Sequence, residues 1–375
     1  MNTKTVMTRA LWQHRARSWD VGVKELRFYL AWLALASALA IATATAMSAQ
    51  TAHKLKVVAS TSDLAALAAE VGGDRIVVES IVRGNQHPHF VESKPSYLLK
   101  LRHADLLIVV GLQLEGGWLT KGVHRPPLLS ESGNPRIQPG APGYLDASRY
   151  AEILGVPAQP LTPDIQPFGS PHYWLDPENG RRIAKAIADK LSELQPDEAS
   201  YFHGRFDAFS KRLSEAESVW DAQMQPYRGR TVVTYHRSWL NFLKHFQLVS
   251  VGEIEPRPGI PPTRSHTRGL INLMKGQNAR IILVEPYFEL KTPNAIARET
   301  GAKVVIAPSS VGGAKGITDY FKLFDYDLTL LTGALKETRE CSPSESMNRR
   351  TEGEVQLSDF VRSAAPCLQG EWVVL

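Results

Sequence analysis

From residue 53 onward, short apolar runs alternate with segments whose apolar residues recur every three to four positions. The stretch 53–82 reads HKLKVVASTSDLAALAAEVGGDRIVVESIV, which predicts a strand, an amphipathic helix and a second strand. A helix at KPSYLLKLRHA precedes the run ADLLIVVG, whose lack of polar alternation indicates a strand buried on both faces. This β-α-β order is typical of a parallel sheet, in which ligands gather at the carboxyl ends of the strands.

The middle of the chain separates two such series. Residues 120–170 are rich in Pro and Gly and show little periodicity, so we expect ordered loops with one short helix near 147–154. A helical pattern then covers 177–224 and breaks only at Gln195-Pro196-Asp197. The part after this break is long for a globular helix, and we expect it to be a spine that joins two lobes.

A second series of apolar strands and amphipathic helices follows the spine. The predicted fold class is therefore α/β, with two Rossmann-like βα lobes, each built on a parallel sheet, joined by a long rigid spine helix. The expected boundaries are 50–195 for the N-terminal lobe, 196–228 for the spine, 229–336 for the C-terminal lobe and 337–375 for a polar tail.

The first 49 residues have a different composition. A basic stretch leads into the apolar block FYLAWLALASALAIATATA and then into small residues, which is the order of a secretory signal peptide. Cleavage after Ala46 or Ala49 fits the small-residue rule. A retained membrane anchor is the alternative, because the apolar block approaches the ~20 residues that a span needs. No cysteine lies near the cleavage site, which argues against a lipid anchor, so we expect a periplasmic protein.

Removal of residues 1–49 takes away six Lys or Arg and two acidic residues, so the formal net charge falls from +5 to +1. This small net charge does not indicate a basic surface that binds nucleic acid. We expect the protein to be a monomer. Export also permits disulfides. The two cysteines, Cys341 and Cys367, are predicted to pair, and the alternative of a thiolate metal site lacks a CxxC motif.

Three of the eleven histidines fall where a strand is expected to give way to a loop: His89, His172 and His236. Three neutral imidazoles with one further donor satisfy tetrahedral Zn²⁺, and strand-end loops of two lobes can converge on one cleft. Each histidine also has an ordinary interpretation. His89 can be a loop residue, His172 can cap the helix that begins near Pro177, and His236 can be a half-buried strand residue.

The surrounding segments decide between these interpretations. HPHFVESKPSYLLKLRHADLLIVVG, SPHYWLDPENG and VVTYHRSWLNFLKHFQL resemble, in order, three segments of the zinc- and manganese-binding solute-binding proteins of metal ABC transporters, the ZnuA and TroA-like cluster. The resemblance covers about residues 55–335 and implies that His89, His172 and His236 are metal ligands in the inter-lobe cleft. It also implies capture of a metal ion and its delivery to an ABC-type membrane permease.

The resemblance leaves the fourth ligand open. Members of the family commonly carry an aspartate after the last strand of the C-terminal lobe, where this chain has Ala307 in IAPSSVGG. Glu285, at the end of IILVEP, is the expected replacement, and its alternative is to orient a ligand histidine. Further competitors are His87, Glu253, Glu255 and water. Glu92 is expected to be solvated or to support a ligand, and His266 to begin a helix.

Manganese-selective members tend to have a carboxylate at the third ligand position, whereas this chain keeps His236. Nitrogen donors favour Zn²⁺ over Mn²⁺, so the expected cargo is Zn²⁺, with manganese, iron or copper as alternatives. A metal-binding adhesin or a periplasmic metal chaperone would share the same site. A zinc hydrolase is the alternative from another functional class. The sequence has no HExxH motif to supply a catalytic base, so we expect that the protein is not an enzyme.

Overall fold

The computed structural model describes residues 32, 54–120, 127–156 and 168–340. The described residues from Lys54 to Glu340 belong to one compact unit. This unit contains two four-stranded parallel sheets, with strand orders β2-β1-β3-β4 and β6-β5-β7-β8. Two α/β lobes with parallel sheets were predicted, and that fold class is confirmed.

The N-terminal lobe is built on the first sheet. Its elements are β1 (Leu55–Ala59), α2 (Ser62–Gly72), β2 (Ile76–Ser80), α3 (Pro95–Arg102), β3 (Leu106–Val109), α4 (Leu128–Glu131), β4 (Tyr144–Asp146) and α5 (Pro177–Leu194). All four residues of β3 are buried, as its unbroken apolar run predicts. Strand β4 was not predicted, because three residues among turns give no readable period. The expected helix at 147–154 is only a 3₁₀ turn at Ala147–Tyr150.

The C-terminal lobe repeats this plan. It contains β5 (Thr231–Thr234), α7 (Leu240–His245), β6 (Val249–Glu253), α8 (Arg264–Gly276), β7 (Ile281–Val284), α9 (Lys291–Thr300), β8 (Lys303–Ile306) and α10 (Tyr320–Glu340). Strand β5 lies between β6 and β7, so the carboxyl ends of these three strands adjoin. Helix α10 continues past residue 336, where the tail was expected to begin.

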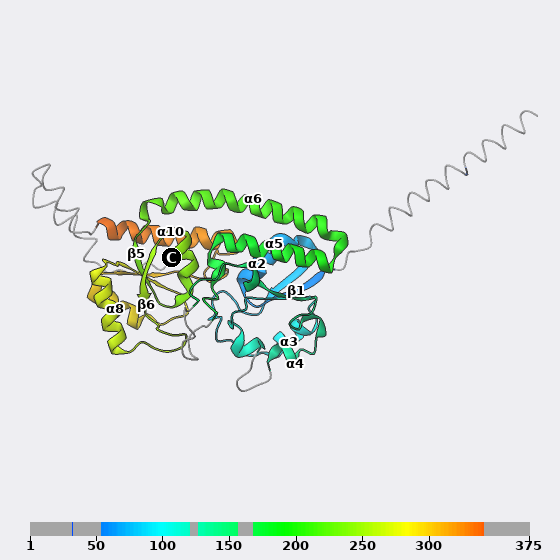
Figure 1. The fold of residues 1–375 in the computed structure, drawn as a ribbon, viewed down its shortest axis with the longest axis horizontal. Coiled ribbons are helices and arrows are strands. Elements are labelled where there is room, and N and C mark those ends of the chain that lie inside the picture. Colours follow the sequence, from blue (N-terminus) through cyan, green and yellow to red (C-terminus); the bar gives the residue numbers. More distant parts are fainter. Residues whose placement is uncertain (1–31, 33–53, 121–126, 157–167, 341–375) are drawn as a thin grey trace, which may run out of the picture. The chain divides into compact units, whose positions relative to one another are not determined.

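The spine is α6 (Ala199–Met224), a helix of 26 residues flanked by 3₁₀ turns at Pro196–Glu198 and Gln225–Tyr227. At 1.5 Å per residue it is about 39 Å long. It packs along α5 and α2 in one lobe and along α10 (Figure 1). Its buried side chains are Phe202, Phe209, Leu213, Trp220 and Met224, so an apolar stripe follows most of its length.

The two lobes also meet in the loop that follows β8. The Trp174 indole nitrogen donates to the carbonyl of Ser309 at 2.9 Å, and the Val311 amide donates to Asp63 Oδ1 at 2.9 Å. Gly84 fits tightly here, because a β-carbon at that position would lie 2.0 Å from the Val311 carbonyl oxygen. These buried bonds hold the loop of one lobe against the other.

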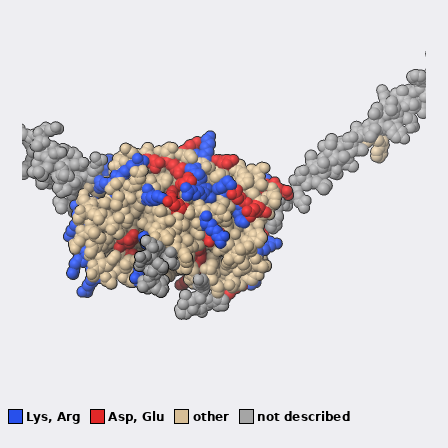
Figure 2. All heavy atoms as spheres, in the orientation of Figure 1, with Lys and Arg blue, Asp and Glu red and all other residues tan. Residues whose placement is uncertain are grey.

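Charges of both signs mingle on the face that Figure 2 shows, around the long helices. Arg181 contacts both Glu178 and Glu217, and Arg212 pairs with Glu70. These pairs bring positive and negative groups together along α5 and α6.

Some predictions fall outside the described residues. These are the signal peptide with its cleavage after Ala46 or Ala49, the pairing of Cys341 with Cys367, and most of the tail. Among residues 32, 54–120, 127–156 and 168–340, no helix is both long and apolar enough to span a bilayer.

Candidate metal centre

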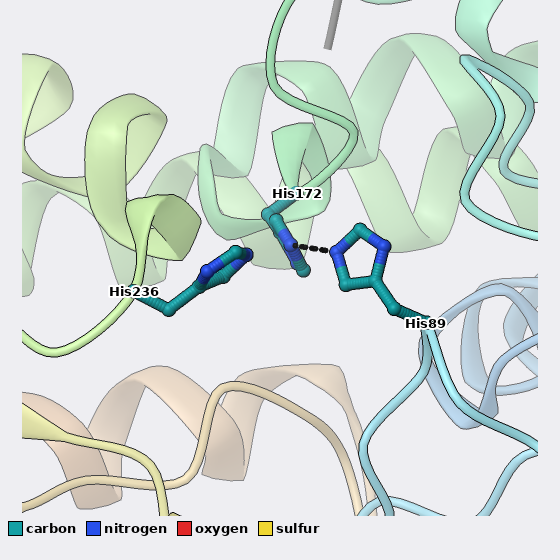
Figure 3. A group of neighbouring side chains, drawn as sticks. All are labelled: His89, His172 and His236. Carbon is teal, nitrogen blue, oxygen red and sulfur yellow. Dashed lines mark hydrogen bonds between the residues drawn. The ribbon is translucent and has the colours of Figure 1, made fainter. Parts of the chain in front are cut away.

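The three predicted histidines come from three separate segments. His89 lies in the loop between β2 and α3, His172 immediately precedes the 3₁₀ turn Tyr173–Leu175, and His236 is the second residue after β5. The chain folds so that their imidazoles face one another (Figure 3). His172 and His236 are almost completely buried. The helix beside Pro177 is capped by Asp176, whose side chain accepts from the Glu178 amide, so His172 is not needed as its cap.

The spacing of the imidazoles suits a single metal ion. One nitrogen from each ring can be chosen so that all three atoms lie within 4.8 Å of one another. His89 Nε2 and His172 Nε2 are 3.2 Å apart. Two nitrogens bound to one tetrahedral Zn²⁺ at 2.0–2.1 Å would be about 3.4 Å apart. Ring centroids are 5.2–5.4 Å apart in all three pairs, so the arrangement is nearly symmetrical.

His236 has a buried acidic partner. Its Nδ1 lies 2.7 Å from Glu255 Oε2, whereas its Nε2 is buried and has no hydrogen-bond partner. A carboxylate accepts a hydrogen bond from Nδ1–H. The proton of the neutral ring is therefore on Nδ1, and Nε2 keeps its lone pair for a metal ion.

Burial also sets the charge of the other two histidines. It holds the pKa of both His89 and His172 well below the usual value of 6.5, and the neighbouring imidazoles act in the same direction. A metal ligand must be the neutral imidazole. Both side chains are therefore in the form that binds metal at neutral pH.

Glu285 follows β7, beside the end of β5. Its side chain is fully buried. Burial raises the pKa of Glu285 to about 7, against the opposing effect of His236. Its oxygens are not part of the group formed by the three histidines. Glu285 as a ligand thus stays a prediction.

The other candidates for the fourth position have different surroundings. Glu255 is already bonded to His236, and Ala307 is a buried residue whose amide donates to the Val284 carbonyl. His87 accepts a hydrogen bond from the His89 amide, and burial lowers its pKa to about 4.

The remaining candidates lie at the edge of the region. His266 is in the first turn of α8, as predicted, with Nε2 2.9 Å from the Glu253 carbonyl oxygen. Glu92 is exposed, which agrees with a solvated side chain.

Glu255 was expected only as a competing ligand, and its bond to His236 was not predicted. A usable signal was present: Glu255 and His236 each lie just beyond the carboxyl end of an apolar strand. Whether those strands are neighbours depends on strand order, which the sequence pattern does not give.

Comparison with known proteins shows to which family the chain belongs. Residues 57–334 match the family model of ZnuA, the periplasmic component A of a zinc-uptake complex. The chain belongs to the ZnuA family. Among curated relatives, the metal ABC transporter substrate-binding lipoprotein SloC of Streptococcus mutans is 24% identical over 295 residues, covering 76% of this chain and 91% of SloC. The manganese ABC transporter substrate-binding lipoprotein PsaA of Streptococcus pneumoniae is 24% identical over 299 residues, 77% of this chain and 92% of PsaA.

Three solved structures, two of them of ZnuA, share the fold. A crystal structure of ZnuA aligns with a TM-score of 0.62 at 24% identity, covering 75% of this chain and 99% of that one. A ZnuA deletion mutant with zinc bound aligns at 0.62 and 26% identity, covering 75% of this chain and 98% of the mutant. The laminin-binding protein Lmb of Streptococcus agalactiae, described as an adhesin with metal-transporting activity, aligns at 0.60 and 24% identity, with 75% and 99% covered.

Proposed function

We propose that this protein captures a Zn²⁺ ion with His89, His172 and His236 and delivers it to an ABC-type membrane permease from the periplasm. The observation that carries the proposal is the convergence of three imidazoles, two of them buried, with two nitrogens 3.2 Å apart, in a member of the ZnuA family. That distance is close to the value of about 3.4 Å for two ligands of one tetrahedral zinc. We also propose that the protein acts as a monomer.

The choice of zinc rests on the donor atoms. Relatives include a protein named for manganese and a structure with zinc bound, so similarity alone does not select the ion. Nitrogen donors suit Zn²⁺, whereas Mn²⁺ prefers oxygen. Glu285 is the proposed fourth ligand, since its carboxylate is fully buried and interacts with the His236 imidazole. Its side chain would have to approach the three histidines when the metal binds.

Export is proposed from the signal-like residues 1–49 together with the family, whose name describes a periplasmic component. An adhesin role is the second candidate, and the observation that favours it is the likeness to Lmb. Growth separates the two. Deletion of the gene should prevent growth under zinc limitation and excess zinc should restore it, whereas loss of adhesion with normal growth would favour the adhesin.

Binding is tested on the metal-free protein by competition titration with a chromophoric zinc chelator. His89→Ala, His172→Ala and His236→Ala should each lower Zn²⁺ affinity by orders of magnitude and leave the fold intact by circular dichroism. His103→Ala is the control, because His103 is exposed at the end of α3. Wild-type affinity in any of the three variants would exclude that histidine as a ligand.

A further inference from the structure

Glu255 is held next to His236 by the backbone of the C-terminal lobe. Beyond β6, the Ile254 amide donates to the Thr234 carbonyl at 2.9 Å, and the Glu255 amide donates to the Tyr235 carbonyl at 2.8 Å. These two bonds extend the pairing of β5 and β6 past the ends of the strands. They fix the backbone of Glu255 beside the residue that precedes His236.

Both oxygens of the Glu255 carboxylate are engaged. Oε2 lies 2.7 Å from His236 Nδ1, and Oε1 accepts from the Gly259 amide at 2.6 Å. The two side chains of the pair are 2% and 6% exposed, so water does not compete strongly for either bond. A carboxylate held by a backbone amide is a well-defined acceptor for one orientation of the imidazole.

Gly259 connects this carboxylate to the other lobe. It lies in the turn 254–260, which is closed by the Ile260 amide donating to the Arg257 carbonyl at 3.0 Å. Its φ of +76° favours glycine, and a β-carbon there would lie 2.9 Å from Phe90 Cζ. Phe90 is the neighbour of His89, in the N-terminal lobe. The contacts therefore run from the His89 loop through Gly259 and Glu255 to His236.

We infer that Glu255 is a positioning residue for metal capture: it directs His236 Nε2 at the metal, and the contact of Gly259 with Phe90 links this orientation to the N-terminal lobe. The inference rests on the proposed function, in which His236 is a ligand. Glu255 is not the fourth ligand, because coordination would take one of its oxygens away from His236 or Gly259.

Zinc titration and Co²⁺ absorption of the metal-loaded protein test the role of Glu255. Loss of a group that supports a ligand histidine typically lowers metal affinity about 10–100-fold. Glu255→Ala should show that loss and a changed Co²⁺ ligand-field spectrum. The zinc affinity of Glu255→Gln should lie between those of Glu255→Ala and wild type, because one amide oxygen cannot fully replace two carboxylate oxygens. If Glu255→Ala does not fold, this near-isosteric variant still tests the inference. Glu299→Gln, which changes an exposed glutamate of α9, is the matched control and should bind normally.

A double variant separates this inference from the proposed function. In the His236→Ala background, the further change Glu255→Ala should have no additional effect on zinc affinity, because its target is gone. A full additional loss would mean that Glu255 binds the metal itself and would overturn the inference. Wild-type zinc affinity and a wild-type Co²⁺ spectrum in Glu255→Ala would also overturn the inference. In that case, weak zinc binding by the single variant His236→Ala would still support the proposed function.

The link to the N-terminal lobe has its own test. Gly259→Ala should lower zinc affinity several-fold, since it strains the turn at a φ of +76° and its methyl group would displace the exposed Phe90 ring. Adding Phe90→Ala should recover part of that loss by removing the ring. If the double variant recovers nothing, the loss comes from the strained turn alone, and the link through Phe90 is refuted.

Discussion

The buried carboxyl group of Asp63 should make the stability of this protein depend on pH in a way that one substitution removes. Asp63 is completely buried at the start of α2; Oδ1 accepts from the Val311 amide at 2.9 Å, and Oδ2 has no hydrogen-bond partner. Burial raises the pKa of Asp63 from 3.8 to about 7, although the bond from Val311 opposes this. Asp63→Asn keeps an oxygen for Val311 and removes the titration.

The sign and size of the effect follow from linkage. Between pH 3.8 and about 7 the unfolded chain has released the Asp63 proton and the folded chain has kept it, so unfolding becomes easier as pH rises. The change is about 1.4 kcal/mol per pH unit, or about 4 kcal/mol in total. The stability contribution is complete below pH 3.8 and is lost as pH rises through the folded pKa.

The assay is urea unfolding of the metal-free wild type and Asp63→Asn at pH 4.5, 6 and 7.5. A chelator is present throughout, because bound metal would add its own pH dependence. The free energy of unfolding of the variant, relative to wild type, should rise steadily with pH by several kcal/mol. Buried acids that do not interact with Asp63 titrate in both proteins and cancel in the difference, whereas Asp327, whose pKa the Asp63 charge helps to raise, does not. A difference that stays constant across this range would refute the reasoning.

Further predictions concern the site and the helices. Glu285→Ala should weaken Zn²⁺ binding more than Glu285→Gln, measured by chelator competition, and equal, wild-type affinity in both would remove Glu285 from the ligand set. Zn²⁺ affinity should decline as pH falls through about 7, because Glu285, whose pKa burial raises to about 7, must lose its proton to bind, whereas His89 and His172 have a lowered pKa and stay neutral; a pH series of titrations on wild type and Glu285→Gln tests this. Gly180→Ala should destabilise by about 1–3 kcal/mol in urea unfolding, because its methyl group would lie 2.2 Å from the Tyr320 hydroxyl. Gly204→Ala, with open space around it, should instead stabilise by about 0.5–1 kcal/mol.

The sequence by itself determined the fold class and the position of the spine. An unbroken apolar run marks β3, and the amphipathic period, with a break at Pro196, marks α5 and α6 to within a few residues. These features are local, because side-chain alternation and helix breaking depend on neighbours in the chain. The three histidines could also be selected, since each lies in a segment that resembles a family motif.

Tertiary structure decided which groups surround those histidines. Glu255 and His236 are 19 residues apart and meet because β6 and β5 are neighbours, and strand order is a choice between distant pairings. The loop after β8 is a second example. The sequence shows only that Ala307 stands where the resemblance leads us to expect an aspartate, whereas the fold brings the Val311 amide of this loop to Asp63, 248 residues away. Local patterns therefore fix the elements and the candidate ligands. The groups that orient these side chains and shift their pKa values are brought to them only by contacts of the folded chain.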